Sequence, residues 1–155
     1  DLSSGSPRVL RPGMILEQSI NVALSEIGFA QATQIADSPR VPGELPSHYA
    51  PDKPVQLIAS ALFKQELARL SALGKRIGVL SFSKPADGVK NWITMSATPA
   101  AYSFFVYRNL RLLDTSAVDL IVVEKPPDES EWVAIRDRLV RAAGDRLSLE
   151  VGDGT

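Results

Sequence analysis

The stretch VDLIVVE, residues 118–124, decides the fold class of this chain of 155 residues. All of it is apolar except for one aspartate near the start and one glutamate at the end. A strand with one face in water alternates polar and apolar residues, whereas a strand covered on both faces of a parallel sheet is apolar almost throughout. We therefore expect residues 118–124 to form a central strand of a parallel sheet.

The segment before this strand has the pattern of a long helix. Thr98 can cap it, and Pro99 suits the first helical position, where no backbone N–H is needed. Apolar residues then recur at helical spacing and predict the face that packs on the core. These predicted core residues are Tyr102, Phe105, Val106, Leu110 and Leu113.

The segment after the strand has the pattern of a second helix. Asp128 and Glu131 have the spacing of a capping box, with aspartate in place of the usual serine or threonine. Gly144 then supplies the residue that ends the helix. The predicted core residues of this helix are Trp132, Ile135, Leu139 and Ala142.

Further out, segments with strand and helix patterns alternate. Alternation of this kind implies an open α/β sheet, and we predict a Rossmann-like, three-layer domain with a mostly parallel sheet. The other expected strands lie at 55–60, 76–83, 91–97 and 147–151, and the other expected helices at 15–27, before Gly28, and at 61–73, before Gly74.

The composition is that of an ordinary globular protein. Hydrophobic residues make up 45% of the chain and the net charge is −1. A charge this small gives no electrostatic case for binding nucleic acid or membranes. Cysteine is absent, which excludes disulfides and thiolate chemistry and fits a reducing cytoplasm. No apolar run approaches the ~18 residues that a membrane span needs.

The familiar catalytic motifs are missing from the sequence. It has no Walker A loop, no dinucleotide-binding glycine motif after the first strand and no nucleophile elbow. One histidine and no cysteine leave only carboxylates as metal ligands, and no paired-carboxylate spacing stands out. We expect no metal site and no catalytic residue in this chain.

Residues 29–54 have neither helical nor strand periodicity and contain five of the chain's 11 prolines. Proline makes a segment extended and semi-rigid, so we expect a linker between two bodies. Its stretch PSHYAPDKP, residues 46–54, carries His48 next to Tyr49. From the residues alone two interpretations stay open. Tyr49 lies on a neighbouring surface and His48 is solvated, or the stiff segment presents both side chains to a partner site.

Two motifs at a fixed separation resemble a known family. LRPG (10–13), then a helix, then PGELPSHYAP (42–51) and a short strand are similar to the two-domain threonylcarbamoyl-AMP synthases. In that family a YrdC-like catalytic domain is joined to a smaller C-terminal domain through a linker with an HYAP motif. Residues 110–144 also resemble the end of the family's C-terminal domain.

The resemblance implies three parts. Residues 1–28 correspond to the end of the catalytic domain, residues 29–52 to the linker and residues 53–155 to the accessory domain. The family joins L-threonine, bicarbonate and ATP into threonylcarbamoyl-AMP, and other proteins help to transfer the product to tRNA. ATP would therefore be a substrate, and magnesium is expected in the intact protein.

The resemblance also implies roles for single residues. Arg11 corresponds to an arginine that contacts the nucleotide, and Tyr49 to a tyrosine that the linker brings over it. His48 and Pro51 belong to the same linker, which would act as a lid. The catalytic body would precede Asp1, so we expect no synthase activity and no bound cofactor for this chain alone. Residues 1–28 would lack the sheet on which they pack and could be disordered or rearranged.

A different class of function stays open beside this one. The α/β domain could be a free-standing nucleotide-sensing or protein-interaction domain with no synthase partner. Saturable ATP binding by the isolated chain, abolished by Tyr49→Ala, would favour the sensing role.

Overall fold

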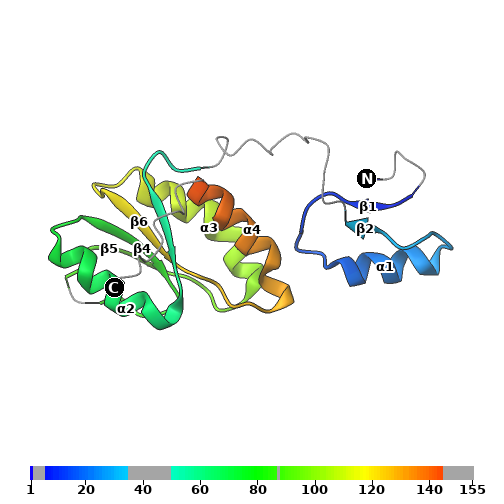
Figure 1. The fold of residues 1–155 in the computed structure, drawn as a ribbon, viewed down its shortest axis with the longest axis horizontal. Helices are drawn as coiled ribbons and strands as arrows, with labels where there is room; N and C mark the ends of the chain where they lie inside the picture. The colour runs from blue at the N-terminus through cyan, green and yellow to red at the C-terminus, as the bar shows by residue number, and fades with distance from the viewer. Residues whose placement is uncertain (2–5, 35–49, 87, 145–155) are drawn as a thin grey trace, which may run out of the picture.

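The computed structural model describes residue 1 and residues 6–34, 50–86 and 88–144. These residues form a small N-terminal unit and a larger α/β domain (Figure 1). The predicted strand at 147–151 lies outside the described residues, as do His48 and Tyr49. The elements of the α/β domain are β3 (Val55–Ile58), α2 (Ser60–Ala72), β4 (Ile77–Ser81), β5 (Asn91–Thr94), α3 (Pro99–Asp114), β6 (Leu120–Glu124) and α4 (Val133–Ala143).

The sheet of the α/β domain has four parallel strands in the order β3-β6-β4-β5. The predicted α/β class and parallel sheet are thus confirmed. The stretch VDLIVVE supplies β6, which lies between β3 and β4 and pairs Val55 with Ile121 and Leu80 with Val123. Its prediction as a central strand was correct.

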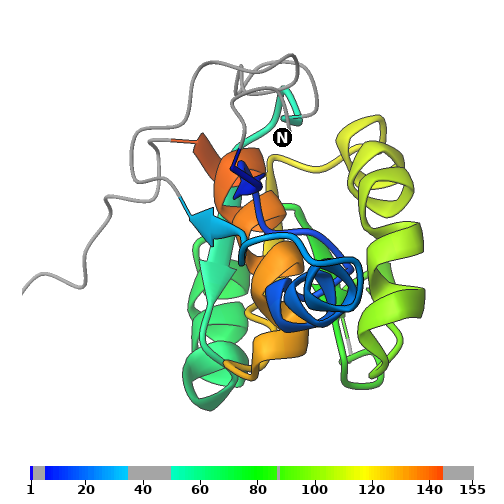
Figure 2. The ribbon, with the colours of Figure 1, turned by 90° about the vertical axis from the view of Figure 1, so that its right-hand side faces the viewer.

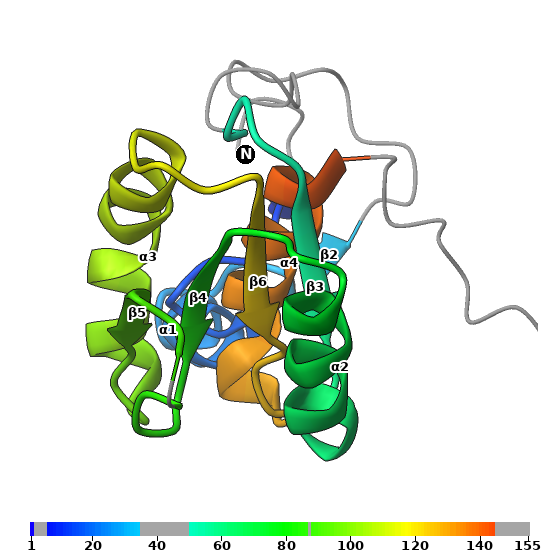
Figure 3. The ribbon, with the colours of Figure 1, turned by 90° about the vertical axis from the view of Figure 1, so that its left-hand side faces the viewer.

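Successive residues of β6 point to opposite faces of the sheet, and this divides the core in two. Val122 packs with Phe63, Leu67 and Leu70 of α2, whereas Ile121 and Val123 belong to the cluster on the side of α3 and α4. Figure 3 shows α2 and α3 on opposite sides of the strands, so the domain has three layers. Ile121, Val122 and Val123, which line one cluster or the other, are all fully buried.

Gly78 of β4 sets how closely α3 approaches the sheet. A Cβ at this position would lie 3.1 Å from Leu113 Cδ2 and 3.4 Å from Val118 Cγ2. The glycine therefore leaves room for the last turn of α3 and for the segment that leads into β6.

Most of the predicted helical faces are confirmed, with one error. Four of the five residues predicted for α3 are buried, but Phe105 is 39% exposed. It lies at the edge of the buried stripe and packs edge-on against Phe104, with ring centroids 4.8 Å apart. All four core residues predicted for the segment 128–144 are buried.

The predicted capping box before α4 is wrong. A 3₁₀ turn at Ser130–Trp132 precedes α4, and neither the turn nor the helix has a side-chain cap. Asp128 instead lies 3.2 Å from Lys125 Nζ. At α3 the predicted start is confirmed, since Thr98 is the N-cap residue and Pro99 follows it. The Thr98 hydroxyl does not cap the helix, because it lies 3.0 Å from the Ser96 hydroxyl.

The N-terminal unit consists of β1 (Arg8–Val9), α1 (Glu17–Glu26) and β2 (Thr33–Gln34). β1 and β2 pair in parallel, so residues 1–28 include secondary structure. The partner strand β2 falls inside the segment predicted to be the linker. Helix α1 begins and ends close to the predicted 15–27, and Gly28 follows with φ +76°. Figure 2 shows the unit on the side of the domain where α4 lies.

Candidate functional site

The carboxyl ends of β4 and β6 carry a polar cluster. The Glu124 carboxylate at the end of β6 accepts hydrogen bonds from the Ser81 hydroxyl at 2.6 Å and the Phe82 N–H at 3.0 Å. Ser81 is 2% exposed and lies 2.7 Å from the Ser83 hydroxyl. The residues join the two central strands at the edge of the sheet where ligands bind in many open α/β folds.

The turn after β4 is fastened to β5 by the backbone of Ser83. Its carbonyl accepts hydrogen bonds from Trp92 Nε1 at 3.2 Å and Thr94 Oγ1 at 3.3 Å. The sheet thus holds the turn, and the turn holds the indole ring of Trp92, in fixed positions at the carboxyl edge.

Tyr102 lies beneath this cluster on the α3 side of the sheet. It is 1% exposed and packs against the rings of Phe82, at 5.4 Å, and Trp132, at 5.5 Å, which also contact each other. Its hydroxyl is buried and has no hydrogen-bond partner among the described residues. Burial, together with the nearby charge of Glu124, raises the pKa of Tyr102 above its ordinary value. The phenol therefore stays protonated at neutral pH and cannot act as a base.

A pocket of about 610 Å³ opens beside the turn, on the face of the sheet that α2 covers. The turn supplies Ser83 and Lys84, α2 supplies Phe63 and Lys64, and β5 supplies Trp92. Its size is typical of sites for small molecules.

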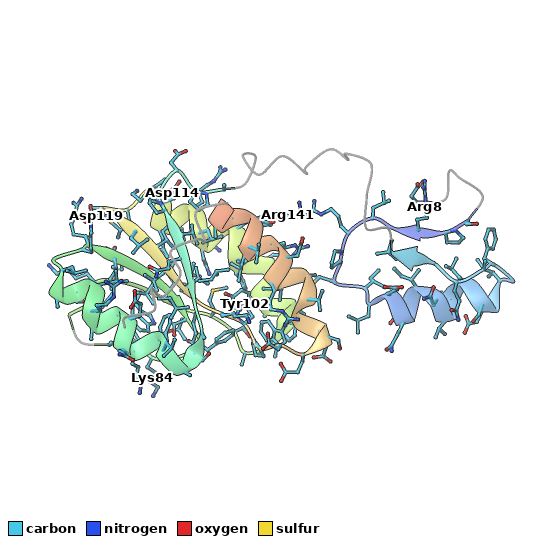
Figure 4. All side chains as sticks on the ribbon, in the orientation of Figure 1. Arg8, Lys84, Tyr102, Asp114, Asp119 and Arg141 are labelled. Carbon is cyan, nitrogen blue, oxygen red and sulfur yellow. The ribbon has the colours of Figure 1, made fainter. Side chains whose placement is uncertain are left out.

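The end of the linker is attached to α3. The Asp114 carboxylate, on the last residue of α3, accepts hydrogen bonds from the backbone N–H groups of Asp52, at 3.3 Å, and Lys53, at 3.0 Å. Figure 4 shows Asp114 close to the point where the chain enters β3. Pro51 lines a hollow of about 320 Å³ together with Tyr107 and other residues of α3.

The start of the chain contacts α4. Arg11 Nη2 lies 3.6 Å from Asp137 Oδ2, and the same carboxylate oxygen accepts a hydrogen bond from Arg141 Nε at 3.1 Å. Residues 9–18 and the start of α4, including Val133, also line a hollow of about 280 Å³. Arg11 is therefore held by an acidic side chain of the α/β domain.

Two classes of site were searched for in the described part of the chain. It contains no group of three or more histidine, cysteine, aspartate or glutamate side chains arranged to hold a metal ion. None of its helices combines the length and the apolar character needed to cross a bilayer.

Comparison with known families gives a match over most of the chain. Residues 15–144 match the family described as threonylcarbamoyl-AMP synthase, C-terminal domain. The chain belongs to this family. The match spans α1, β2 and all the elements of the α/β domain, and it confirms the family that the sequence resembles. HYAP lies within the matched residues, whereas LRPG (10–13) precedes them.

Curated relatives and solved structures agree with the family match. The threonylcarbamoyl-AMP synthase of Bacillus subtilis is 30% identical over 149 residues and that of Pyrococcus abyssi 28% identical over 156. They align with 91% and 95% of this chain, which spans only 43% and 45% of their lengths. The crystal structure of P. abyssi Sua5 complexed with L-threonine is similar to this chain, with a TM-score of 0.71 and 25% identity. The similar region covers 94% of this chain and 45% of the Sua5 chain.

The structure of this member of the threonylcarbamoyl-AMP synthase family places two of the four predicted site residues. Arg11 contacts α4 and Pro51 contacts α3, so the described residues do not bring the two together in one site. Tyr49 and His48 lie outside the described residues, and their predicted roles stay predictions.

Sequence reasoning missed the residues that hold the ends of the N-terminal unit and linker. Asp114 and Asp137 are acidic residues on helices, and the linker and N-terminal residues that they hold lie far away in the sequence. Asp114 is the last residue of α3, a place where the negative end of the helix dipole disfavours a carboxylate. That mismatch is the one local signal that could have singled it out.

Proposed function

We propose that this chain acts as the C-terminal part of an L-threonylcarbamoyladenylate synthase. The reaction joins the amino group of L-threonine to bicarbonate as a carbamate. The carbamate oxygen then attacks the α-phosphorus of ATP, so that pyrophosphate leaves and water is lost overall. The product serves the threonylcarbamoyladenosine modification of tRNA. The proposed roles of this chain are to supply the linker as a lid and to hold it through the α/β domain.

The attachment of Pro51–Lys53 to α3 is the observation that carries the lid proposal. Asp114 fixes the backbone within four residues of Tyr49. On the other side, pairing of β2 with β1 fixes the chain at Gln34. The described residues on both sides of the segment with the HYAP motif are thus held by strand pairing or hydrogen bonds, which supports a lid that closes over one site. A lid of this kind would protect an adenylate from water.

The exposed apolar surface of the N-terminal unit supports a neighbouring body. Helix α1 has no buried residue, and Ile15 and Ile27 are each 68% exposed. Phe29, which follows the helix, is 53% exposed. Apolar side chains in this number on one small unit are typical of an interface. We propose that the YrdC-like catalytic domain covers them.

Arg11 would serve the nucleotide in this arrangement. A guanidinium group is permanently charged and suits a phosphate-bearing ligand. Asp137 Oδ2 lies 3.6 Å from Arg11 Nη2, so a carboxylate of the α/β domain helps to orient this guanidinium group. ATP is a substrate here, and the expected magnesium would accompany its phosphates rather than a cage of described residues.

The proposal is tested by measuring threonylcarbamoyl-AMP by mass spectrometry after incubation with ATP, L-threonine and bicarbonate. This chain should be compared with a version extended upstream of Asp1 by the length that the relatives have. We expect product from the extended version alone. Absence of product from a folded extended version would refute the synthase assignment. Product from this chain by itself would refute the proposal that it is only the C-terminal part of the enzyme.

The lid is tested in the extended version with Tyr49→Ala and Asp114→Ala. Both should reduce product formation and increase hydrolysis of the adenylate, because water reaches it when the lid is absent or loose. Asp128→Ala is the matched control, since Asp128 is an exposed carboxylate paired only with Lys125 among the described residues. Unchanged product formation and hydrolysis in both variants would rule out the lid.

A further inference from the structure

We propose that the pocket between α2 and the turn after β4 binds a small organic anion with a flat apolar ring, of the nucleoside monophosphate class. The lining of this pocket includes neither Arg11 nor Pro51. The proposal does not depend on the synthase activity, since it concerns the α/β domain by itself.

The position of the pocket is the first argument. The turn that follows the carboxyl end of β4 lines the pocket with Ser83 and Lys84, on the face of the sheet that α2 covers. Ligands of open α/β sheets bind outside the carboxyl ends of the strands, and the pocket adjoins the carboxyl end of the central strand β4.

The charge of the pocket is the second argument. Its described lining contains two cationic side chains, Lys64 from α2 and Lys84 from the turn, and no acidic one. Neither ammonium group forms an ion pair with a described residue. Lysine ammonium groups bind phosphates as point charges.

The apolar wall of the pocket supplies the third argument. Phe63 and Trp92 both line it, with ring centroids 6.3 Å apart and planes at 86°. The indole N–H of Trp92 is bound to the Ser83 carbonyl, so its ring is held in place before a ligand arrives. A fixed aromatic surface costs little conformational entropy on binding. Leu67 and Val89 extend the same apolar wall.

These features together specify the ligand. A ring fits the wall of Phe63 and Trp92, an anionic group fits the two lysines, and the hydroxyl groups of Ser71 and Ser83 offer hydrogen bonds to polar atoms between them. Figure 4 shows Lys84 at the edge of the domain beside α2, and its side chain is exposed. Neither a bare ring nor a bare phosphate uses both halves of the pocket.

The test titrates this chain at low ionic strength with AMP, adenosine and inorganic phosphate, using calorimetry and tryptophan emission. We expect saturable binding of AMP, with adenosine and phosphate each binding at least roughly tenfold more weakly. AMP should change the emission of Trp92, since the pocket contains this tryptophan and not the buried Trp132. Trp92→Phe should therefore abolish the emission change.

The double variant Lys64→Ala/Lys84→Ala locates the site. Both lysines are exposed, so the variant should fold, and we expect AMP to bind roughly tenfold more weakly because two exposed charge contacts are lost. Lys75→Ala removes the same charge at the opposite end of α2, outside the pocket, and should bind AMP as the unchanged chain does. Added salt should weaken AMP binding to the unchanged chain more than to the double variant.

Two results would overturn the proposal. One is the absence of saturable binding with AMP and with the monophosphates of guanosine, cytidine and uridine. The other is AMP binding that the double lysine variant leaves intact. AMP binding that is lost in Arg11→Ala instead would assign the nucleotide to the site of Arg11 and reject the pocket.

Discussion

Helices α1 and α4 are nearly equal in length, with 10 and 11 residues, yet they differ completely in burial. Helix α4 buries five residues, including Ile135 and Leu139, whereas α1 buries none. Both helices were predicted from the same kind of apolar spacing. The difference teaches that the spacing identifies a helix with an apolar face and says nothing about whether the surface that covers this face lies within the described chain.

The comparison extends to the two units as a whole. The α/β domain has a large apolar cluster on each face of its sheet. The N-terminal unit has two strands of two residues each, and Pro7 and Ala32 are its only buried residues among those whose burial the structure describes. The stability of the described chain should therefore come almost entirely from the α/β domain, and each prediction below tests this contrast.

Matched isoleucine substitutions should show the largest difference. Ile135→Ala removes a side chain that is 0% exposed and should lower the free energy of unfolding by about 2–5 kcal/mol, because it leaves a cavity. Ile15→Ala removes a side chain that is 68% exposed and should change the free energy of unfolding by less than about 0.5 kcal/mol. Urea unfolding of the two variants checks this, and equal losses would contradict the contrast.

Matched glycine substitutions should show the next largest difference. Gly78→Ala brings a methyl group 3.1 Å from Leu113 and should cost about 1–3 kcal/mol of unfolding free energy, because α3 must shift. Gly13→Ala meets nothing closer than 3.9 Å and should cost almost nothing. The measurement is thermal unfolding, and a harmless Gly78→Ala would mean that α3 can move away from β4 freely.

The junction between the linker and the α/β domain should respond more weakly. Asp114→Ala removes the acceptor of the Asp52 and Lys53 N–H groups and should loosen the linker locally by about 1–2 kcal/mol. Hydrogen exchange of these two amides should accelerate about tenfold. Asp128→Ala should leave their exchange unchanged, and equal rates in all three proteins would show that Asp114 does not hold the linker.

Lowering the pH should have the smallest effect on the free energy of unfolding, and this effect should come from the α/β domain. Hydrogen bonds from the side chain and backbone N–H of Arg76 lower the pKa of Asp119 from 3.8 to about 2. Because the folded pKa lies below the unfolded one, the stabilisation is present above about pH 4 and is lost as the pH falls through about 2. Asp119→Asn should therefore flatten the fall in unfolding free energy between pH 4 and 2. An unchanged slope would show that the ion pair does not contribute to folding.

Much of the α/β domain could be predicted because short sequence patterns specify its helices and strands. The apolar run of β6 and the positions of Gly28, Gly74 and Gly144 at helix ends follow from short-range sterics and burial. Phe105 was misplaced because it sits three residues after buried Tyr102 and beside buried Val106, at the limit of the apolar stripe. Sequence spacing cannot tell which residue at such a limit stays in contact with the sheet.

The candidate sites could be predicted less well, because their residues meet only in three dimensions. Glu124 and Ser81 are 43 residues apart and were not singled out. The partners of Asp114 are backbone groups, 61 and 62 residues away, which leave no mark in the sequence. Lys64, Lys84 and Trp92 come from three separate elements, and only the folding of α2 against β5 and the turn makes them one surface.

The strand order has a consequence for how the protein is made on the ribosome. Strand β6 is synthesised after β3, β4 and β5, and β3 pairs only with β6, whereas β4 pairs with β6 and β5 but not with β3. A nascent chain that ends before residue 120 therefore cannot join its first strand to the rest of the sheet. Until VDLIVVE has been synthesised, α2 lacks part of the sheet on which it packs. The pairing of Val55 with Ile121 is therefore a late event in folding, and it closes a loop of 66 residues.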